Sequence, residues 1–278
     1  MNTTLVERVI NKSVRIATNP IRIMPSFIIT GAKKCGTTSL FHYLSEHPNI
    51  GAPIKKEISY FDINFAKGNQ WYKSFFPISL PGNESPYLIT GEATANYICH
   101  PQAPQRIAKI LPQVKLIALL RNPVDRAYSH YHHTKRIGRE DLSFEEALKQ
   151  EDFRVKQIEQ IENNSFNFIS NHHGAYNYTY LSSGLYAEQL ENWFAHFDEK
   201  QFLILKSEDY FSHPEIIFQQ VLDFLELPNW SPKRFKKYNY NAYPQKMDSN
   251  TRKHLIEYFQ PHNEKLYELL GVDFGWNK

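Results

Sequence analysis

One segment near the N-terminus constrains the fold more than any other. In residues 25–40 (PSFIITGAKKCGTTSL), an apolar run leads directly into a loop bracketed by Gly31 and Gly36, and the start of a helix follows. The backbone N–H groups of such a loop, and of the helical turn behind it, point at one place where the helix dipole also favours negative charge. The segment therefore predicts a strand, a phosphate-binding loop and a helix in succession.

The spacing of the two glycines is that of the Walker loop G-x-x-x-x-G-K-[ST], but Thr37 stands where the lysine belongs and the lysine occurs earlier, as Lys34. A P-loop NTPase also needs a carboxylate at the end of a neighbouring strand to hold magnesium. The best candidate for that strand, residues 115–120, is followed by Arg121. Two cations without a carboxylate predict a site for a dianionic ligand without a metal; the alternative is a glycine turn with no ligand.

Strand and helix patterns alternate along the chain in the order that a doubly wound sheet requires. We expect strands at 28–30, 88–92, 115–120 and 201–206, and helices at 39–46, 104–111, 123–135, 214–225, 184–194 and 252–270. The first and third strands are continuously apolar, which is typical of central parallel strands covered on both faces. The pattern predicts an α/β, P-loop-like three-layer fold with a central, mostly parallel sheet flanked by helices. Ligands of such sheets bind beyond the carboxyl ends of the strands, where Lys34 and Arg121 fall.

Two motifs give the chain a specific resemblance. Residues 34–38 (KCGTT) look like the 5′-phosphosulfate loop of the sulfotransferases that use 3′-phosphoadenosine 5′-phosphosulfate (PAPS), and residues 120–131 (LRNPVDRAYSHY) are similar to that family's 3′-phosphate element. The resemblance runs from about residue 26 to 276 and is closest in motif style to the heparan sulfate and carbohydrate sulfotransferases. It implies PAPS as the sulfuryl donor, with no metal required. The donor-binding residues that it implies are Lys33, Lys34, Cys35, Gly36, Thr37, Thr38, Ser39, Arg121, Ser129 and Tyr186.

A chain of 278 residues with 41% hydrophobic residues can bury one sizeable core. We expect an N-terminal extension, residues 1–24, and a single sulfotransferase domain, residues 25–278. A polar, Asn-rich and irregular insertion at about 140–180 could close over the acceptor.

A formal net charge of +3 is too small to imply nucleic acid or a polybasic membrane patch as partner. The N-terminus lacks the hydrophobic core of a signal peptide, and no apolar run approaches the length of a membrane span. With two cysteines, Cys35 and Cys99, a disulfide scaffold is not expected. We therefore expect a cytoplasmic protein.

The candidate general base is Glu57, in the stretch KKEISYFD that begins at Lys55. A transfer to a hydroxyl needs a carboxylate or similar group to take the acceptor proton. The stretch is similar to the Lys-Glu-x-x-Phe-Phe pattern of heparan sulfate sulfotransferases, and the resemblance implies that Glu57 is the base and that Lys34 stabilises the leaving phosphate. The alternative is a surface carboxylate paired with Lys56.

Further candidates lie along the same expected edge of the sheet. Glu92 ends a strand and is expected to face the cleft, as a second acid or base or as a structural carboxylate; the heparan sulfate enzymes have a lysine where Ala93 stands. His130, His132 and His133 allow a metal site, but no third ligand with its support is evident, so we expect them to line the cleft or the surface. In the late loop at 238–246, the family's basic position could be taken by Lys236, Lys237 or Lys246.

The resemblance implies sulfuryl transfer from PAPS to a hydroxyl, or an amine, of a carbohydrate or related acceptor. Two alternatives remain at this point: a divergent P-loop nucleotide kinase, which would need magnesium, and a nucleotide-binding module without catalytic activity. The presence of both Lys34 and Glu57 disfavours the second.

Overall fold

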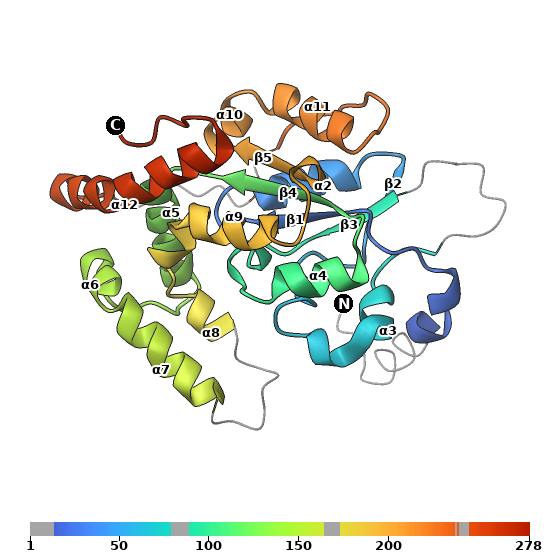
Figure 1. Cartoon of the computed structure of the whole chain (residues 1–278), viewed down its shortest axis with the longest axis horizontal. Helices are drawn as coiled ribbons and strands as arrows, with labels where there is room; N and C mark the ends of the chain where they lie inside the picture. The colour runs from blue at the N-terminus through green and yellow to red at the C-terminus, as the bar shows by residue number, and fades with distance from the viewer. Residues whose placement is uncertain (1–13, 79–88, 164–172, 237, 239–244) are drawn as a thin grey trace.

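The computed structural model describes residues 14–78, 89–163, 173–236, 238 and 245–278. Within these residues a sheet of five strands, all parallel, lies between layers of helices (Figure 1). The strand order is β2-β3-β1-β4-β5. The bounds are Phe27–Gly31 for β1, Ile50–Gly51 for β2, Ile89–Ala93 for β3, Lys115–Leu120 for β4 and Phe202–Lys206 for β5. The expected three-layer α/β fold with a central parallel sheet is confirmed.

The two central strands, β1 and β4, are buried on both faces, as their continuous apolar sequences require. Alternate residues face different cores, because successive side chains of a strand point to opposite sides. Ile29 of β1 packs in a core with Leu40 and with Phe218. Ile28, on the other side, packs in a second core with Ile107. The sheet is therefore fixed from both faces, and so are the loops at its carboxyl ends.

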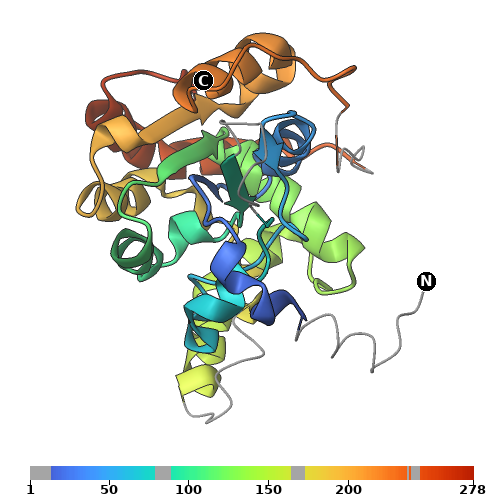
Figure 2. The same ribbon diagram turned by 90° about the vertical axis from the view of Figure 1, so that its right-hand side faces the viewer.

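The helices that flank the sheet lie close to their expected positions (Figure 2). Their bounds are Thr37–Ser45 for α2, Gly68–Lys73 for α3, Ala103–Ile110 for α4, Pro123–Arg136 for α5, Tyr186–Phe194 for α9, Ser207–Ser212 for α10, Pro214–Phe224 for α11 and Ser249–Leu270 for α12. The short strand β2 and the helices α3 and α10 were not expected. Helix α2 begins at Thr37 and not at Ser39, because Gly36 adopts a left-handed conformation as its N-cap.

The described parts of the segment at 140–180 are largely helical and not irregular as expected. They form α6 (Phe144–Lys149), α7 (Glu151–Asn163) and α8 (His173–Tyr176), and α6 and α7 lie below α5, away from the sheet, in Figure 1. Helix α6 begins with a capping box, in which Ser143 and Glu146 satisfy each other's backbone N–H groups. Residues 164–172, which carry part of the Asn-rich run, lie outside the described residues.

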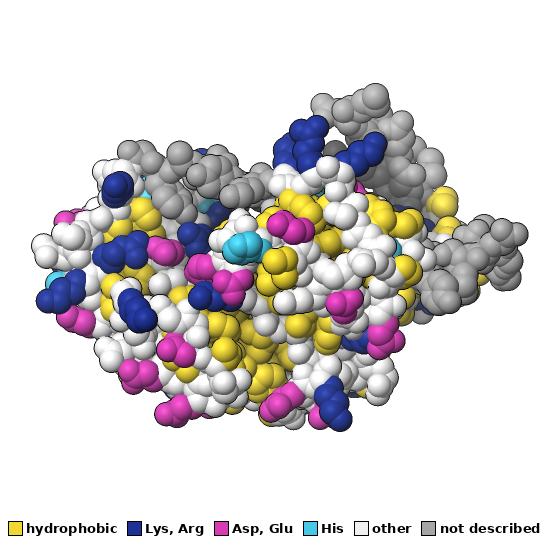
Figure 3. Space-filling model, turned by 90° about the horizontal axis from the view of Figure 1, so that it is seen from above, with side chains coloured by type: hydrophobic (Ala, Val, Ile, Leu, Met, Phe, Trp, Pro, Cys, Tyr) yellow, Lys and Arg dark blue, Asp and Glu magenta, His cyan; other side chains and the backbone are white. Residues whose placement is uncertain are grey.

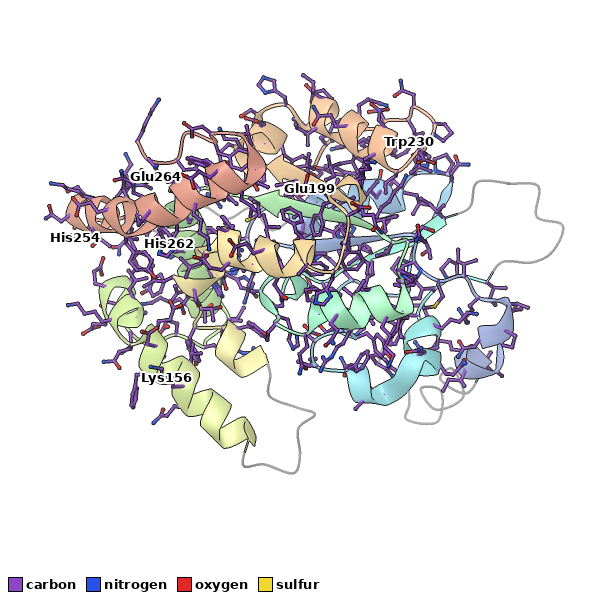
Figure 4. The ribbon with its side chains drawn as sticks, in the orientation of Figure 1. Lys156, Glu199, Trp230, His254, His262 and Glu264 are labelled. Atoms are coloured by element: carbon purple, nitrogen blue, oxygen red, sulfur yellow. The ribbon has the colours of Figure 1, made fainter. Side chains whose placement is uncertain are left out.

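Helix α12 packs against α5. Leu255 and Phe259 of α12 belong to a third core with Val124 and Ala127 of α5. Further along α12, the His262 side chain, labelled in Figure 4, has its Nδ1 atom 3.3 Å from a carboxylate oxygen of Glu188 on α9. Packing against α12 thus fixes α5, and one face of α5, from Asp125 to Arg136, forms a wall of the site described below.

The described part of the N-terminal extension, residues 14–24, packs on the domain. The Asn19 side chain is buried and donates to the backbone oxygen of Gln70 in α3 at 2.7 Å. Arg22 forms an isolated antiparallel bridge with Ile78. These contacts attach the extension to the part of the chain that precedes β3.

Candidate active site

A cleft of about 1580 Å³ opens beyond the carboxyl ends of the central strands. Its lining includes Lys33 and Lys34, which follow β1, and Arg121, which follows β4. The described lining contains nine lysine and arginine side chains but only two carboxylates, those of Glu57 and Asp125. The basic residues are Lys33, Lys34, Lys56, Arg121, Lys135, Arg136, Arg139, Lys246 and Arg252. On the face seen in Figure 3, by contrast, basic side chains are interspersed with acidic ones. The cleft therefore attracts anions locally, although the whole chain carries a formal charge of only +3.

The loop between β1 and α2 forms an anion cradle. Gly36 has φ +97°, and a Cβ atom added there would lie 2.9 Å from the Phe211 ring, so both conformation and space require glycine. The N–H groups of the first turn of α2 have no partner within the helix and are available to an anion at this end. Lys34 also has a positive φ, of +72°. Ser207 fixes the loop from β5's side by donating to the Cys35 carbonyl oxygen at 2.8 Å.

The two lysines of the cradle lie in a strongly cationic environment. Burial, together with the charges of Arg136 and Arg121, lowers the pKa of Lys34 to about 8. Burial also lowers the pKa of Lys33 to about 8, and its Nζ atom donates to the Tyr176 carbonyl oxygen at 3.3 Å. A bound anion would relieve the repulsion between these groups, so the residues present fit a phosphate or phosphosulfate group.

The second motif places Arg121 and Ser129 in the same cleft. Helix α5 begins directly after β4, with the Asn122 side chain accepting from the Val124 N–H at 3.0 Å and proline at the first helical position. Ser129 lies two turns further along this helix and lines the cleft. A guanidinium and a hydroxyl from one strand end and its following helix suit a second phosphate.

Two of the expected donor-binding residues lie behind the cleft and not in its lining. Tyr186 is buried, and its hydroxyl donates to the Arg121 carbonyl oxygen at 2.9 Å. Cys35 is fully buried, and burial raises the pKa of its thiol to about 11. Both side chains support the loops that carry the cleft residues. The other expected residues line the cleft: Lys33, Lys34, Gly36, Thr37, Thr38, Ser39, Arg121 and Ser129.

Glu57 lies in the cleft with the cradle, on the loop that follows β2. Its side chain is 42% exposed, and its carboxylate forms an ion pair with Lys56. One carboxylate oxygen also accepts from the Ala95 N–H at 3.2 Å. Glu57 and Ser59 both have φ +55°, a conformation that costs on the order of 1–3 kcal/mol for an ordinary residue. The ion pair between Glu57 and Lys56, which the alternative of a surface carboxylate required, is present. Both residues line the cleft, however.

Glu92 does not face the cleft, and that expectation was wrong. The residue is fully buried, and its carboxylate accepts from the hydroxyls of Tyr72 at 2.6 Å, Thr94 at 3.1 Å and Tyr97 at 3.2 Å. Burial raises the pKa of this carboxyl group to about 8. Glu92 therefore matches the alternative given above, in which its carboxyl group is structural and not a second acid or base.

The three histidines of α5 separate in the structure. His132 and His133 line the cleft, as expected, whereas His130 is fully buried, with its Nδ1 atom 3.5 Å from a guanidinium nitrogen of Arg126. Burial and the charges of Lys34 and Lys33 lower the pKa of His133 to about 4, so this imidazole is neutral at physiological pH. In the part of the chain that the structure describes, no group of three potential metal ligands occurs.

Of the three lysines considered for the late basic position, Lys246 lines the cleft. Lys237 lies outside the described residues, as do residues 239–244. Lys236 contributes its carbonyl oxygen, which accepts from the Tyr43 hydroxyl at 2.7 Å.

Several cations of the cleft were not identified from the sequence. Lys135, Arg136 and Arg139 lie at and beyond the end of α5 and line the cleft with Lys56. In the sequence these residues form a basic run at the end of the helix that carries Ser129, and this run could have indicated that they line the cleft. That pattern is also the common one for stabilising a helix C-terminus, which is why it did not indicate a site.

Comparison with known proteins assigns the family. The model of the sulfotransferase domain matches residues 24–268. The chain is 32% identical to the membrane-associated sulfotransferase kil1 of Dictyostelium discoideum and 30% identical to the human heparan sulfate glucosamine 3-O-sulfotransferase 3B1, over 91% of its length in each case. It spans 66% and 65% of the lengths of these two relatives.

A solved bacterial structure supports the same assignment. The sulfotransferase from Alicyclobacillus acidocaldarius superposes with a TM-score of 0.74 at 28% identity, over 92% of this chain and 100% of that one. No helix among the described residues is long and apolar enough to cross a membrane. The cradle and the Arg121 motif thus occur in the fold that their sequences suggested, and the chain belongs to the sulfotransferase domain family, whose members use PAPS as sulfuryl donor.

Proposed function

We propose that this protein transfers the sulfuryl group of PAPS to a hydroxyl, or an amine, of a carbohydrate or related acceptor. The observation that carries the proposal is the convergence of Lys34, Glu57 and Arg121 on one cleft from three separate loops. A cation for the leaving phosphate, a carboxylate for the acceptor proton and a second phosphate site are the groups that this transfer needs.

The donor would lie with its 5′-phosphosulfate on the cradle and its 3′-phosphate against α5. Lys34 and the N–H groups at the start of α2 would hold the first group, and Arg121 and Ser129 the second. The low pKa of Lys34, about 8, agrees with a site that is completed electrostatically by an anion.

In the transfer, the acceptor oxygen forms a bond to sulfur while the bond from sulfur to the bridging phosphate oxygen breaks. The electron pair of the broken bond stays on the 5′-phosphate, where Lys34 stabilises the growing charge. The proton of the acceptor hydroxyl goes to a carboxylate oxygen of Glu57. Oε2 of this carboxylate accepts from the Ala95 N–H and Oε1 pairs with Lys56; each oxygen has a second electron pair that could take the acceptor proton.

A carbohydrate acceptor is proposed because of the relatives' activities. The human relative is by name a glucosamine 3-O-sulfotransferase that acts on heparan sulfate. Ala93 stands where the heparan sulfate pattern has lysine, and it is buried in the core and is not part of the cleft lining.

Nucleotide binding tests the proposal against the kinase alternative. Adenosine 3′,5′-bisphosphate should raise the melting temperature without magnesium, because it carries the 3′-phosphate that Arg121 and Ser129 are placed to bind. ATP should raise it much less, with or without magnesium. Equal stabilisation by the two nucleotides would contradict the proposal, and stabilisation by ATP only with magnesium would favour a kinase.

A further inference from the structure

The segment that carries Glu57 is held in an unfavourable backbone conformation. We call residues 57–61 the Glu57 loop. Glu57 and Ser59 in this loop both have φ +55°, in the left-handed region that ordinary residues rarely adopt. Such conformations persist only where the surrounding structure fixes them. The position of the Glu57 carboxylate therefore depends on whatever holds the Glu57 loop.

Two side-chain hydroxyls of the segment that follows β3 hold it. The Thr94 hydroxyl oxygen accepts from the Ser59 N–H at 3.3 Å. The Tyr97 hydroxyl oxygen accepts from the N–H groups of Tyr60 and Phe61, at 2.8 and 3.2 Å. Both hydroxyls are buried, so these N–H groups have no access to water in exchange for a lost partner.

Both hydroxyls are hydrogen-bonded to the same buried carboxyl group, that of Glu92. Thr94 donates to Oε2 of Glu92 at 3.1 Å, and Tyr97 donates to Oε1 at 3.2 Å. A hydroxyl has one proton and two acceptor positions. Because the Tyr97 oxygen already accepts two N–H bonds, its proton must point at an acceptor, and Glu92 provides it. Glu92 thus fixes the rotation at which these hydroxyls accept from the loop.

We propose that Glu92 is a positioning residue, which holds the Glu57 loop through the hydroxyls of Thr94 and Tyr97 and so aims the Glu57 carboxylate into the cleft. The inference rests on the proposed role of Glu57 as the base. Glu92 is fully buried and does not line the cleft, so it acts through other residues and not on a ligand. The same segment also holds the carboxylate directly, since the Ala95 N–H donates to Glu57.

The geometry at Glu92 distinguishes a conservative substitution from a disruptive one. Oε1 accepts from two tyrosine hydroxyls, Tyr72 and Tyr97, while Oε2 faces Thr94. In Glu92→Gln, the amide oxygen can take the place of Oε1 and the NH₂ group can donate to the Thr94 oxygen. Glu92→Gln should therefore keep the loop in place, whereas Glu92→Leu removes the acceptor at similar size.

Tyr72 offers a matched control for Tyr97. Both tyrosines are buried and both donate to Oε1 of Glu92, but Tyr72 makes the shorter bond, 2.6 Å, and its hydroxyl accepts from no N–H of the Glu57 loop in the structure. Tyr97→Phe and Tyr72→Phe each remove one hydroxyl and keep the ring. General destabilisation should affect both variants, while loss of the hold on the loop should affect Tyr97→Phe alone.

Hydrogen exchange measured by mass spectrometry tests, independently of catalysis, whether these hydroxyls fix the Glu57 loop. In a peptide that covers the Glu57 loop, Tyr97→Phe and Glu92→Leu should exchange about tenfold faster or more than the unsubstituted protein, and Tyr72→Phe and Glu92→Gln should not. Unchanged exchange in Tyr97→Phe, or equal acceleration in Tyr72→Phe, would overturn the inference. If Glu92→Leu does not fold, the two tyrosine variants and Glu92→Gln still decide.

A second experiment measures the effect of the same variants on turnover of radiolabelled PAPS, with a glucosaminyl oligosaccharide or water as acceptor. Tyr97→Phe should lower kcat about tenfold or more and leave the dissociation constant of adenosine 3′,5′-bisphosphate unchanged, because the donor cradle is separate from the Glu57 loop. Glu92→Gln should keep kcat. Faster exchange of the loop with normal kcat would instead remove Glu57 from the chemistry, which overturns its role in the proposed function and the positioning role together.

Discussion

Arg121 and Lys34 lie in direct contact, with a guanidinium nitrogen of Arg121 donating to the backbone carbonyl oxygen of Lys34 at 3.4 Å. One residue follows β4 and the other follows β1, the adjacent central strands of the sheet. The contact joins the two segments proposed to bind the donor and places two cations at one end of the cleft. Their mutual repulsion helps to lower the pKa of Lys34, after burial and the charge of Arg136.

Lys34→Ala should reduce turnover much more than it weakens binding of adenosine 3′,5′-bisphosphate. The charge of Lys34 is needed most as the leaving phosphate develops, and one preorganised electrostatic group is worth about a hundredfold to a thousandfold in rate. Steady-state kinetics with calorimetric titration of the nucleotide would separate the two effects. Near-normal turnover in this variant would remove Lys34 from the mechanism.

The pKa of Lys34 also predicts an alkaline limit to activity. With a pKa of about 8, Lys34 loses its charge as the pH rises above that value, so kcat/KM for PAPS should fall on the alkaline side. Arg136→Gln removes a neighbouring positive charge and should move this limit to higher pH. Lys33 also has a pKa of about 8, but Arg136 is not among the causes of its shift. A limit that does not move in Arg136→Gln would assign the titration to another group.

Glu92 should make stability depend on pH. Its ordinary pKa of 4.5 is raised to about 8 by burial, so the folded protein keeps a proton that the unfolded chain loses between these values. The free energy of unfolding should therefore decrease as the pH rises from about 4.5 to 8 and level off above. Asp62, whose pKa burial raises to about 6, contributes in the same direction.

Urea denaturation across this pH range would isolate the contribution of Glu92. In Glu92→Gln the side chain cannot ionise, so the variant should gain stability relative to the unsubstituted protein as the pH rises. A difference between the two proteins that is independent of pH would show that Glu92 is ionised throughout.

Local sequence patterns predicted the centre of the fold and the position of the glycine-bracketed loop in the cleft. The apolar runs of β1 and β4 and the glycine at position 36 determine their structure through neighbours in sequence, which is why these elements and the Lys34 cradle were placed correctly. The role of Glu57 was predicted from the need for a carboxylate and from the resemblance, and no local pattern in KKEISYFD requires a cleft position. The structure places Glu57 there through contacts with the distant segment after β3.

The expectations for Glu92 and Tyr186 failed for one physical reason. The direction in which each side chain points depends on how its strand or helix packs in the fold, which local sequence does not specify. Glu92 pairs in register with Ile28, whose side chain belongs to the core that contains Tyr72 and Tyr97, so Glu92 points into that core and not into the cleft. Tyr186 likewise faces inward from α9. The helices at 140–163 were missed for a different reason, because the polar composition of the run obscured the capping signal of Ser143 and Glu146.

The central claim, that Glu57 takes the acceptor proton, is tested most directly by Glu57→Gln with Glu92→Gln as its matched control. The same substitution is made at two glutamates, one in the cleft and one buried behind it. Transfer of radiolabelled sulfate from PAPS should fall about a hundredfold to ten-thousandfold in Glu57→Gln, with donor binding retained, because the amide keeps the shape and loses the basic oxygen. Glu92→Gln should remain active. An active Glu57→Gln beside an inactive Glu92→Gln would contradict the account.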